Sequence, residues 1–139
     1  MEHLDMKIEV KKPPVWDEVH KHFEIDDERT VYTWGDTICN PANLSLNQEL
    51  IDHESTHARQ QIAIGGPEIW WGKYLIDSDF RLQQEAEAYS NQYISFCSRV
   101  KDRNRQAKYL WLLAETLSSP MYKVNVHLMD ALKLIKSYI

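Results

Sequence analysis

The chain has 139 residues, of which 43% are hydrophobic and 27% are charged, and its formal net charge is −5. This length and composition favour a single globular domain over residues 1–139, and the acidic balance argues against general binding to the phosphate backbone of nucleic acids. The two cysteines, Cys39 and Cys97, do not make a disulfide framework, and no apolar run reaches the roughly 18 residues that a membrane helix needs.

The first forty residues predict short strands and one helix. Residues 1–14 are charged and end in two prolines, so we expect a short strand at Lys7–Val10 or a loose arm. The segment VWDEVHKHF spaces Trp16, Val19 and Phe23 as a helix does, and RTVYTWGDTICNP has the β-branched and aromatic residues of a strand. The N-terminus lacks the apolar stretch of a signal peptide, so the cytoplasm is the expected compartment.

From Ser45 onward the pattern is helical almost to the end of the chain. The clear breaks are GGP at residues 65–67 and SSP at residues 118–120. We therefore expect about two strands followed by four or five helices. The predicted fold class is α+β and mainly helical, with a small N-terminal sheet before a helical core.

The best-defined helix carries the sequence HESTH. Ser45 and Gln48 predict a capping box at its start, and Gly65 predicts its end. At about 100° per residue, His53 and His57 fall on one stripe. The other members of this stripe are Leu46, Leu50, Gln61 and Ile64, whereas Glu49, Asp52, Thr56 and Arg59 lie opposite. Both imidazoles are therefore expected to point toward the core.

Two inward histidines one helical turn apart can bind one metal ion, and Glu54 lies beside them, within reach of a metal-bound water. The alternative is that both histidines are ordinary buried residues that form hydrogen bonds. A capped helix with the whole His-Glu-x-x-His motif on its inward side favours the metal. We predict one Zn²⁺ per chain, held by His53 and His57, with Glu54 as the catalytic base.

The third zinc ligand must come from elsewhere in the chain. Gln60 and Ala63 occupy the places of the glycine and third histidine of HExxHxxGxxH, so that arrangement is excluded. Glu85 and Glu87 are the candidates on a later helix. Glu85 shares an apolar face with Leu82, Tyr89, Tyr93, Phe96 and Val100. A carboxylate there is costly unless paired or metal-bound, so Glu85 is the predicted ligand, and an ion pair with Arg81 is the alternative.

HESTH followed by EAEA resembles the gluzincin class of zinc metallopeptidases, in which E-x-x-A on a second helix supplies the third ligand; Glu85 and Ala88 match it. HESTHARQ, WWGKYL and RLQQEAEAY also resemble small gluzincin-like proteins of bacterial and phage genomes, over residues 30–95. The resemblance implies a zincin-like core and peptide-bond hydrolysis. One departure is Tyr89, which stands where many gluzincins have an aspartate that supports the first histidine. We expect Asp52 or a backbone carbonyl to give that support.

A hydrolase of this kind also needs a donor for the developing oxyanion. Tyr74 is the first choice, because WWGKYL must lie between the two ligand helices, and His127 is the second. In the resembled class an edge strand before the zinc helix pairs with an extended peptide, and Val31–Trp34 would take that part. An ordinary core strand is the alternative.

The expected partner is a peptide or protein substrate, with neither nucleic acid nor membrane involved; the sequence leaves the oligomeric state open. Two alternatives remain. One is a non-catalytic zinc-binding structural or interaction module, in which Cys39, Cys97 or another side chain closes the fourth position of the metal. The other is an amidase that acts on a cell-wall amide.

Overall fold

The structure is a computed structural model and describes residues 5–139. Three short strands in this part of the chain form one small sheet. Strand β1 (Lys7–Glu9) pairs in parallel with β3 (Thr37–Cys39), and β2 (Tyr32–Trp34) pairs with β3 in antiparallel register. The order is β1-β3-β2, so β2 lies at an edge. The expected strand at residues 7–10 is present, whereas residues 1–4 of the predicted arm lie outside the described residues.

The prediction of a single strand in RTVYTWGDTICNP was wrong, because this segment forms a hairpin. Its two-residue turn is Gly35-Asp36, and Gly35 has a φ of +62°, a value that glycine adopts without steric cost. Glycine at the first central position of a two-residue turn is a hairpin signal. The hairpin raises the number of strands from the expected two to three among the described residues.

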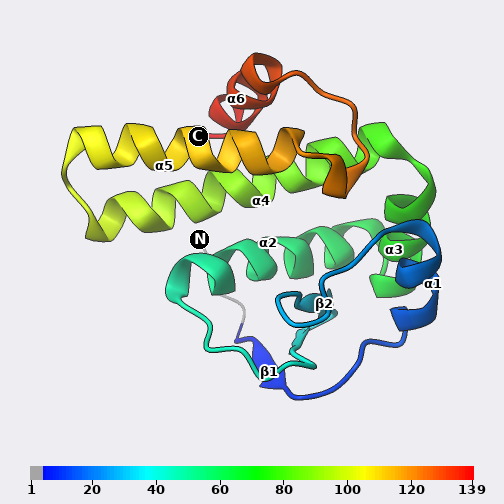
Figure 1. Ribbon diagram of the computed structural model, residues 1–139. Helices are drawn as coiled ribbons and strands as arrows, with labels where there is room; N and C mark the ends of the chain where they lie inside the picture. Colours follow the sequence, from blue (N-terminus) through cyan, green and yellow to red (C-terminus); the bar gives the residue numbers. More distant parts are fainter. Residues whose placement is uncertain (1–4) are drawn as a thin grey trace.

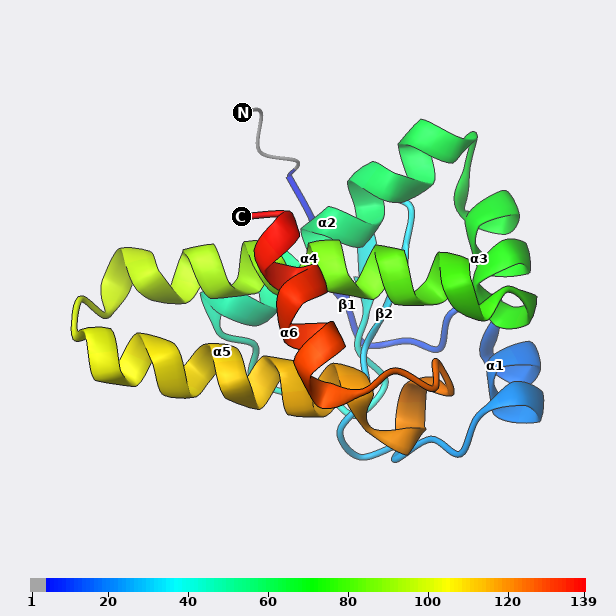
Figure 2. The same ribbon diagram turned by 90° about the horizontal axis from the view of Figure 1, so that it is seen from above.

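The described residues otherwise form six α-helices, so the α+β and mainly helical fold class is confirmed. They are α1 (Trp16–His22), α2 (Gln48–Ile64), α3 (Pro67–Ile76), α4 (Ser78–Arg99), α5 (Arg103–Ser118) and α6 (Leu128–Ser137), with a single 3-10 turn at Pro120–Tyr122. Figure 1 shows α2 between the strands and the antiparallel pair α4 and α5, and Figure 2 shows α6 crossing that pair.

Helix α2 begins at Gln48, so the predicted capping box of Ser45 and Gln48 was wrong. The cap is Asn47, whose side-chain oxygen accepts a hydrogen bond from the Leu50 N–H at 2.9 Å. Asparagine caps a helix as well as serine does, and the sequence offers both. The predicted end is correct, since Gly65 takes the left-handed conformation after Ile64.

The predicted inward stripe of α2 is only partly correct. Leu50 is 37% exposed, whereas Thr56, expected on the outer side, is 1% exposed and accepts a hydrogen bond from Asn91 of α4. The reason is that α2 is covered on two sides, by β2 and by α4. A helix covered on two sides buries most of its circumference, so a prediction based on one apolar face underestimates the number of buried residues.

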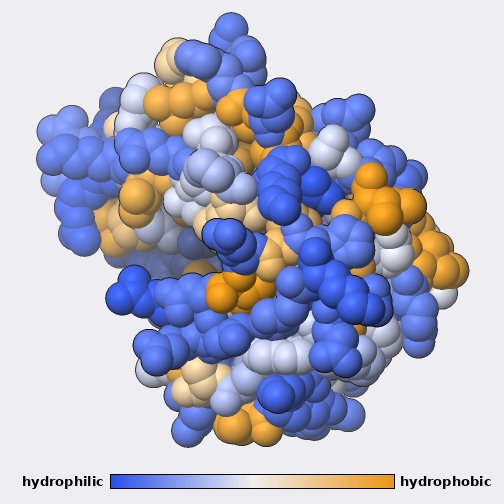
Figure 3. All heavy atoms as spheres, turned by 45° about the vertical axis from the view of Figure 1, so that its right-hand side comes forward, coloured by the Kyte–Doolittle hydropathy of each residue, from blue (hydrophilic) through white to orange (hydrophobic). Residues whose placement is uncertain are grey.

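Two apolar clusters lie on either side of α2. The first joins α1, α3 and the sheet, and the second joins α4, α5 and α6. The buried residues of α2 itself are nearly all polar, from His53 to Gln61. In the part of the chain that the structure describes, no helix combines the length and the apolar character needed to cross a membrane. Figure 3 shows one face, where apolar side chains form separate patches among hydrophilic ones.

Candidate metal centre

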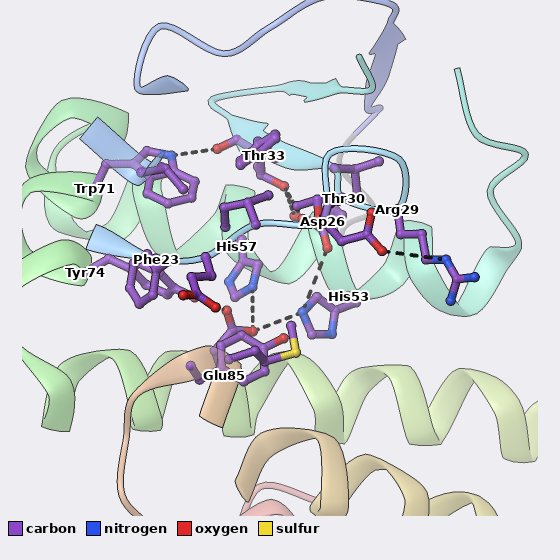
Figure 4. A pocket seen from close by; sticks show the side chains of 18 of the residues that line it. Phe23, Asp26, Arg29, Thr30, Thr33, His53, His57, Trp71, Tyr74 and Glu85 are labelled. Carbon is purple, nitrogen blue, oxygen red and sulfur yellow. Dashed lines mark hydrogen bonds and ion pairs between the residues drawn. The ribbon is translucent and has the colours of Figure 1, made fainter. Parts of the chain in front are cut away.

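His53 and His57 of α2 and Glu85 of α4 converge on one point between the two helices (Figure 4). The Nε2 atoms of both histidines lie 3.1 Å from the same oxygen, Oε1 of Glu85. The three residues are only 4–6% exposed. Glu87, the competing candidate, lies outside this group.

The hydrogen bonds of Gln60 determine which nitrogen of His57 carries a proton. The Gln60 Nε2 donates to the carbonyl oxygen of Gln84 at 3.0 Å and to Oε1 of Glu87 at 2.8 Å. Its Oε1 therefore faces the Nδ1 of His57 at 2.8 Å and must accept a hydrogen bond from an Nδ1–H. A neutral His57 then has only a lone pair on Nε2, and this lone pair faces a carboxylate oxygen of Glu85. A cation between the two atoms removes the repulsion.

His53 is held in the same way from the other helix. Its Nδ1 lies 2.9 Å from Oε1 of Gln92, whose Nε2 donates to the hydroxyl of Tyr109 at 2.8 Å. Gln92 thus gives the support that we expected from Asp52 or a backbone carbonyl, and that expectation was wrong. The carboxylate of Asp52 instead accepts from Gln48 at 2.9 Å.

Without a metal, the cluster favours protons in its place. Burial lowers the pKa of His57, but the charge of Glu85 and the hydrogen bond to it raise that pKa more strongly, to about 9. Burial raises the pKa of Glu85, but the charge of His57 and the hydrogen bonds from both histidines outweigh it and hold the pKa below its usual range. Both shifts reflect the need for positive charge beside this buried carboxylate.

Glu54 has one oxygen anchored and the other facing the cluster. Its Oε1 accepts a hydrogen bond from Oγ1 of Thr33 at 3.0 Å, and its Oε2 lies 3.8 Å from Nε2 of His53. Glu54 is adjacent to the ligand group but not part of it. A carboxylate in this position can accept a proton from a molecule bound at the cluster.

Tyr74 reaches the cluster from α3. Its hydroxyl donates to Oε2 of Glu85 at 2.5 Å, and its ring stacks on that of Trp70 at a centroid distance of 4.7 Å. Burial raises the pKa of Tyr74 well above its ordinary value, and the negative charge of Glu85 is the second largest cause. Tyr74, the first choice for the oxyanion donor, therefore lies at the site, but its hydroxyl already donates its hydrogen bond to the proposed ligand Glu85.

His127, the second choice, does not line the cleft above this cluster. It is exposed at the start of α6, where its Nδ1 accepts from the Met129 N–H at 3.2 Å. Helix α6 begins only at Leu128, because Lys123 and Asn125 before it have positive φ angles that interrupt a helix. His127 as an oxyanion donor was thus a wrong assignment.

A cavity of about 400 Å³ borders the cluster of His53, His57 and Glu85. His53, Glu54, His57 and Glu85 form its base, and α1, α3 and the loop of residues 24–31 contribute its walls. Figure 4 shows Phe23, Trp71 and Tyr74 on one side of the histidines, and Asp26, Arg29 and Thr30 on the other. The cluster is thus buried within the protein but borders a cleft.

The edge of β2 is only partly free. The carbonyl oxygen of Thr33 accepts from Nε2 of Gln61 and from Nε1 of Trp71, both at 2.9 Å. A carbonyl has two lone pairs, so this oxygen has no further acceptor capacity for a substrate. Of the residues expected to pair with a peptide, Val31, Tyr32 and Thr33 line the cleft, and Trp34 does not.

Three other predicted groups lie apart from the cluster. Cys39 is fully buried in β3, where burial raises the pKa of its thiol, and Cys97 lies near the end of α4. Neither belongs to the His53, His57 and Glu85 group. The guanidinium of Arg81 donates to the carbonyl oxygens of Tyr74, Tyr122 and Lys123. It does not pair with Glu85, so the alternative of a buried ion pair between these two residues was wrong.

Comparison with known proteins gave no match, whether to a protein-family model, a curated protein or a solved structure. The gluzincin resemblance therefore stays a prediction that rests on the sequence motif.

Proposed function

We propose that this chain is a zinc-dependent hydrolase of peptide bonds, of the gluzincin type, with one zinc ion held by His53, His57 and Glu85. The supporting observation is the convergence of two histidine nitrogens on one carboxylate oxygen at 3.1 Å each. Donor atoms around a tetrahedral zinc lie roughly 3.3 Å apart, which is close to the two nitrogen–oxygen distances, and all three ligand atoms lie within 4.8 Å of one another. Two imidazoles and a carboxylate are also a common ligand set of catalytic zinc.

When bound, zinc supplies an acidified water molecule and polarises the carbonyl of the substrate. Glu54 would accept a proton from a water molecule at the cluster on Oε2, the carboxylate oxygen that Thr33 leaves free, and would deliver it to the departing amine. Gln60 and Gln92 hold the Nδ1 atoms of the two histidines, so that the Nε2 lone pairs would be available to the ion. Tyr74 orients Glu85, and the oxyanion role expected of it requires its hydroxyl to turn away from that carboxylate.

The proposed substrate is a peptide or protein. A non-catalytic zinc module is the second candidate. It is favoured by the burial of the three ligands, which are 4–6% exposed. The cavity beside the cluster favours the enzyme, because a structural zinc site has no need of access from outside.

The deciding experiment is Glu54→Gln, with Glu68→Gln on the exposed start of α3 as the matched control. Zinc content, melting temperature and turnover are measured on each protein, with peptide and peptidoglycan libraries as substrates. Glu54→Gln should keep one zinc per chain and the wild-type melting curve, and should lose on the order of a hundredfold in rate. Glu68→Gln should keep all three.

Three other outcomes would change the proposal. Wild-type turnover in Glu54→Gln would remove this residue from the mechanism. A zinc-loaded wild type that cleaves neither library would favour the non-catalytic module. Gently purified protein without zinc, and unable to bind it, would refute the metal centre itself.

A further inference from the structure

The two ends of the cleft differ in burial. At the aromatic end, Phe23, Trp71 and Tyr74 are only 7–8% exposed. At the polar end, the side chain of Asp26 is 60% exposed and that of Arg29 is 86% exposed. Figure 4 shows the metal-binding residues between these ends. A ligand group gains much more from leaving water at the buried aromatic end than from contacts with charges that water already solvates.

The aromatic end is preformed, because its rings hold one another. Tyr74 stacks on Trp70 at 4.7 Å, meets Trp71 edge-on at 5.1 Å and lies 6.3 Å from Phe23. The Nε1 of Trp71 is fixed by its hydrogen bond to the carbonyl oxygen of Thr33. Rings in such contact lose little freedom when a ligand binds, so an apolar side chain would enter at low entropic cost.

Recognition through the substrate backbone is restricted at the same place. The Thr33 carbonyl is saturated by Gln61 and Trp71, so an extended peptide cannot continue a β-ladder along β2 past this residue. In strand-addition complexes, main-chain hydrogen bonds along an edge supply the affinity. At Thr33 the carbonyl oxygen offers a substrate no such hydrogen bond.

We propose that the cleft selects its substrate by one bulky apolar side chain, preferably aromatic, next to the scissile amide, and that the length of the substrate adds little. This inference rests on the proposed function, since it places the reacting amide at the metal centre. It predicts compact amides or short peptides as substrates, in preference to long extended polypeptides.

The test uses hydroxamates, which chelate zinc, and measures their binding to the zinc-loaded protein by calorimetry. Phenylalanine hydroxamate should bind roughly 10- to 100-fold more tightly than glycine hydroxamate, as expected for burial of one aromatic side chain. The same comparison on a succinyl hydroxamate framework places the side chain one carbon further from the zinc. Extending the better phenylalanine ligand by two glycines should change its affinity by less than the step from glycine to phenylalanine.

Two pairs of variants locate the effect. Ile25 lines the cleft and is half-buried, whereas Ile69 on α3 is exposed and does not line it. Ile25→Asp should remove most of the preference for phenylalanine, and Ile69→Asp should keep it. If Ile25→Asp does not fold, Met121→Asp tests the rim of the cleft, with Met129→Asp on α6 as its control.

Equal affinity for the glycine and phenylalanine ligands on both frameworks, with zinc bound, would overturn this inference and leave the proposed function intact. A larger gain from lengthening than from the side chain would also overturn it. Protein that binds no zinc would refute the inference and the proposed function together.

Discussion

At the scale of single residues, the proposed metal centre depends on amides as much as on its charged groups. The side-chain oxygens of Gln60 and Gln92 each accept a hydrogen bond from the Nδ1–H of a histidine, and this leaves both Nε2 atoms free for a metal. Glu87 then holds Gln60 in place through a hydrogen bond of 2.8 Å. Outer partners of this kind orient the ligands and contribute to metal affinity.

Tyr74→Phe separates two roles of this tyrosine. If its hydroxyl mainly orients Glu85, zinc affinity should fall roughly 10- to 100-fold, because the carboxylate loses its partner. If it mainly serves the oxyanion, zinc affinity should persist while kcat falls. We expect the loss of zinc affinity, measured by competition with a fluorescent chelator. Tyr89→Phe is the control, because its hydroxyl meets Tyr122 and not a carboxylate.

A second pair of variants tests the choice of ligand. Glu85→Gln replaces the proposed ligand by a weak donor and should reduce zinc affinity by more than the roughly 10- to 100-fold expected for loss of an outer partner. Glu87→Gln should keep wild-type affinity, because the new amide oxygen can still accept from Gln60. The same competition assay measures both proteins. Loss of zinc in Glu87→Gln alone would show that the assignment is reversed.

At the scale of elements, His20 joins α1 to the loop that lines the cleft. Its Nδ1 lies 2.7 Å from the carbonyl oxygen of Trp16, and its Nε2 lies 2.6 Å from Oδ1 of Asp27. Both partners are acceptors, so the ring satisfies them together only when it is protonated. The hydrogen bond to Asp27 accordingly raises the pKa of His20 above its ordinary value, although the partial burial of the ring opposes this.

We therefore expect the imidazole of His20 to titrate above pH 6.5, as followed by NMR, and Asp27→Asn to bring its pKa back toward that value. A raised pKa in the folded state means that the contribution to stability is complete below pH 6.5 and is lost as the pH rises through the folded value. Wild type should thus exceed Asp27→Asn in melting temperature at pH 5.5 by more than at pH 9. Equal differences at both values would contradict the pairing.

At the scale of the whole molecule, a buried polar layer separates the two apolar clusters. The sheet, α1 and α3 lie on one side, α4, α5 and α6 lie on the other, and α2 supplies the polar groups between them. The proposed zinc would bind residues of both α2 and α4 and so connect the two halves. Metal binding to a folded site is also folding free energy.

Removal of zinc should consequently lower the melting temperature. A ligand at a hundredfold excess over its Kd stabilises the folded state by about 2.7 kcal/mol, and for a chain of 139 residues this corresponds to a shift of roughly 10 °C. Differential scanning fluorimetry with and without a chelator measures it. Glu85→Gln is the control, and its melting temperature should respond little to the chelator. An unchanged wild type would show that the ion does not connect the two halves.

The sequence by itself determined the mainly helical fold class, the ends of several helices and the location of the proposed metal site. These follow from local rules: a histidine pair spaced by one helical turn, a glutamate on an apolar face and glycines that end a helix. Glu85 could be preferred to Glu87 because a helical face is a property of spacing alone. The Gly35-Asp36 turn is also a local signal, and it predicts the hairpin that the single-strand prediction lacks.

Only the tertiary structure decided which side chains meet across elements. Thr33, Gln60, Gln61 and Gln92 carry the hydrogen bonds around the centre, yet nothing in their local sequence distinguishes them from exposed polar residues. Their partners lie on other elements or are oriented by them, and the cost of burying each polar group is offset only by that particular contact. The support of His53 by Gln92 spans 39 residues of chain, a distance over which local sequence patterns carry no information.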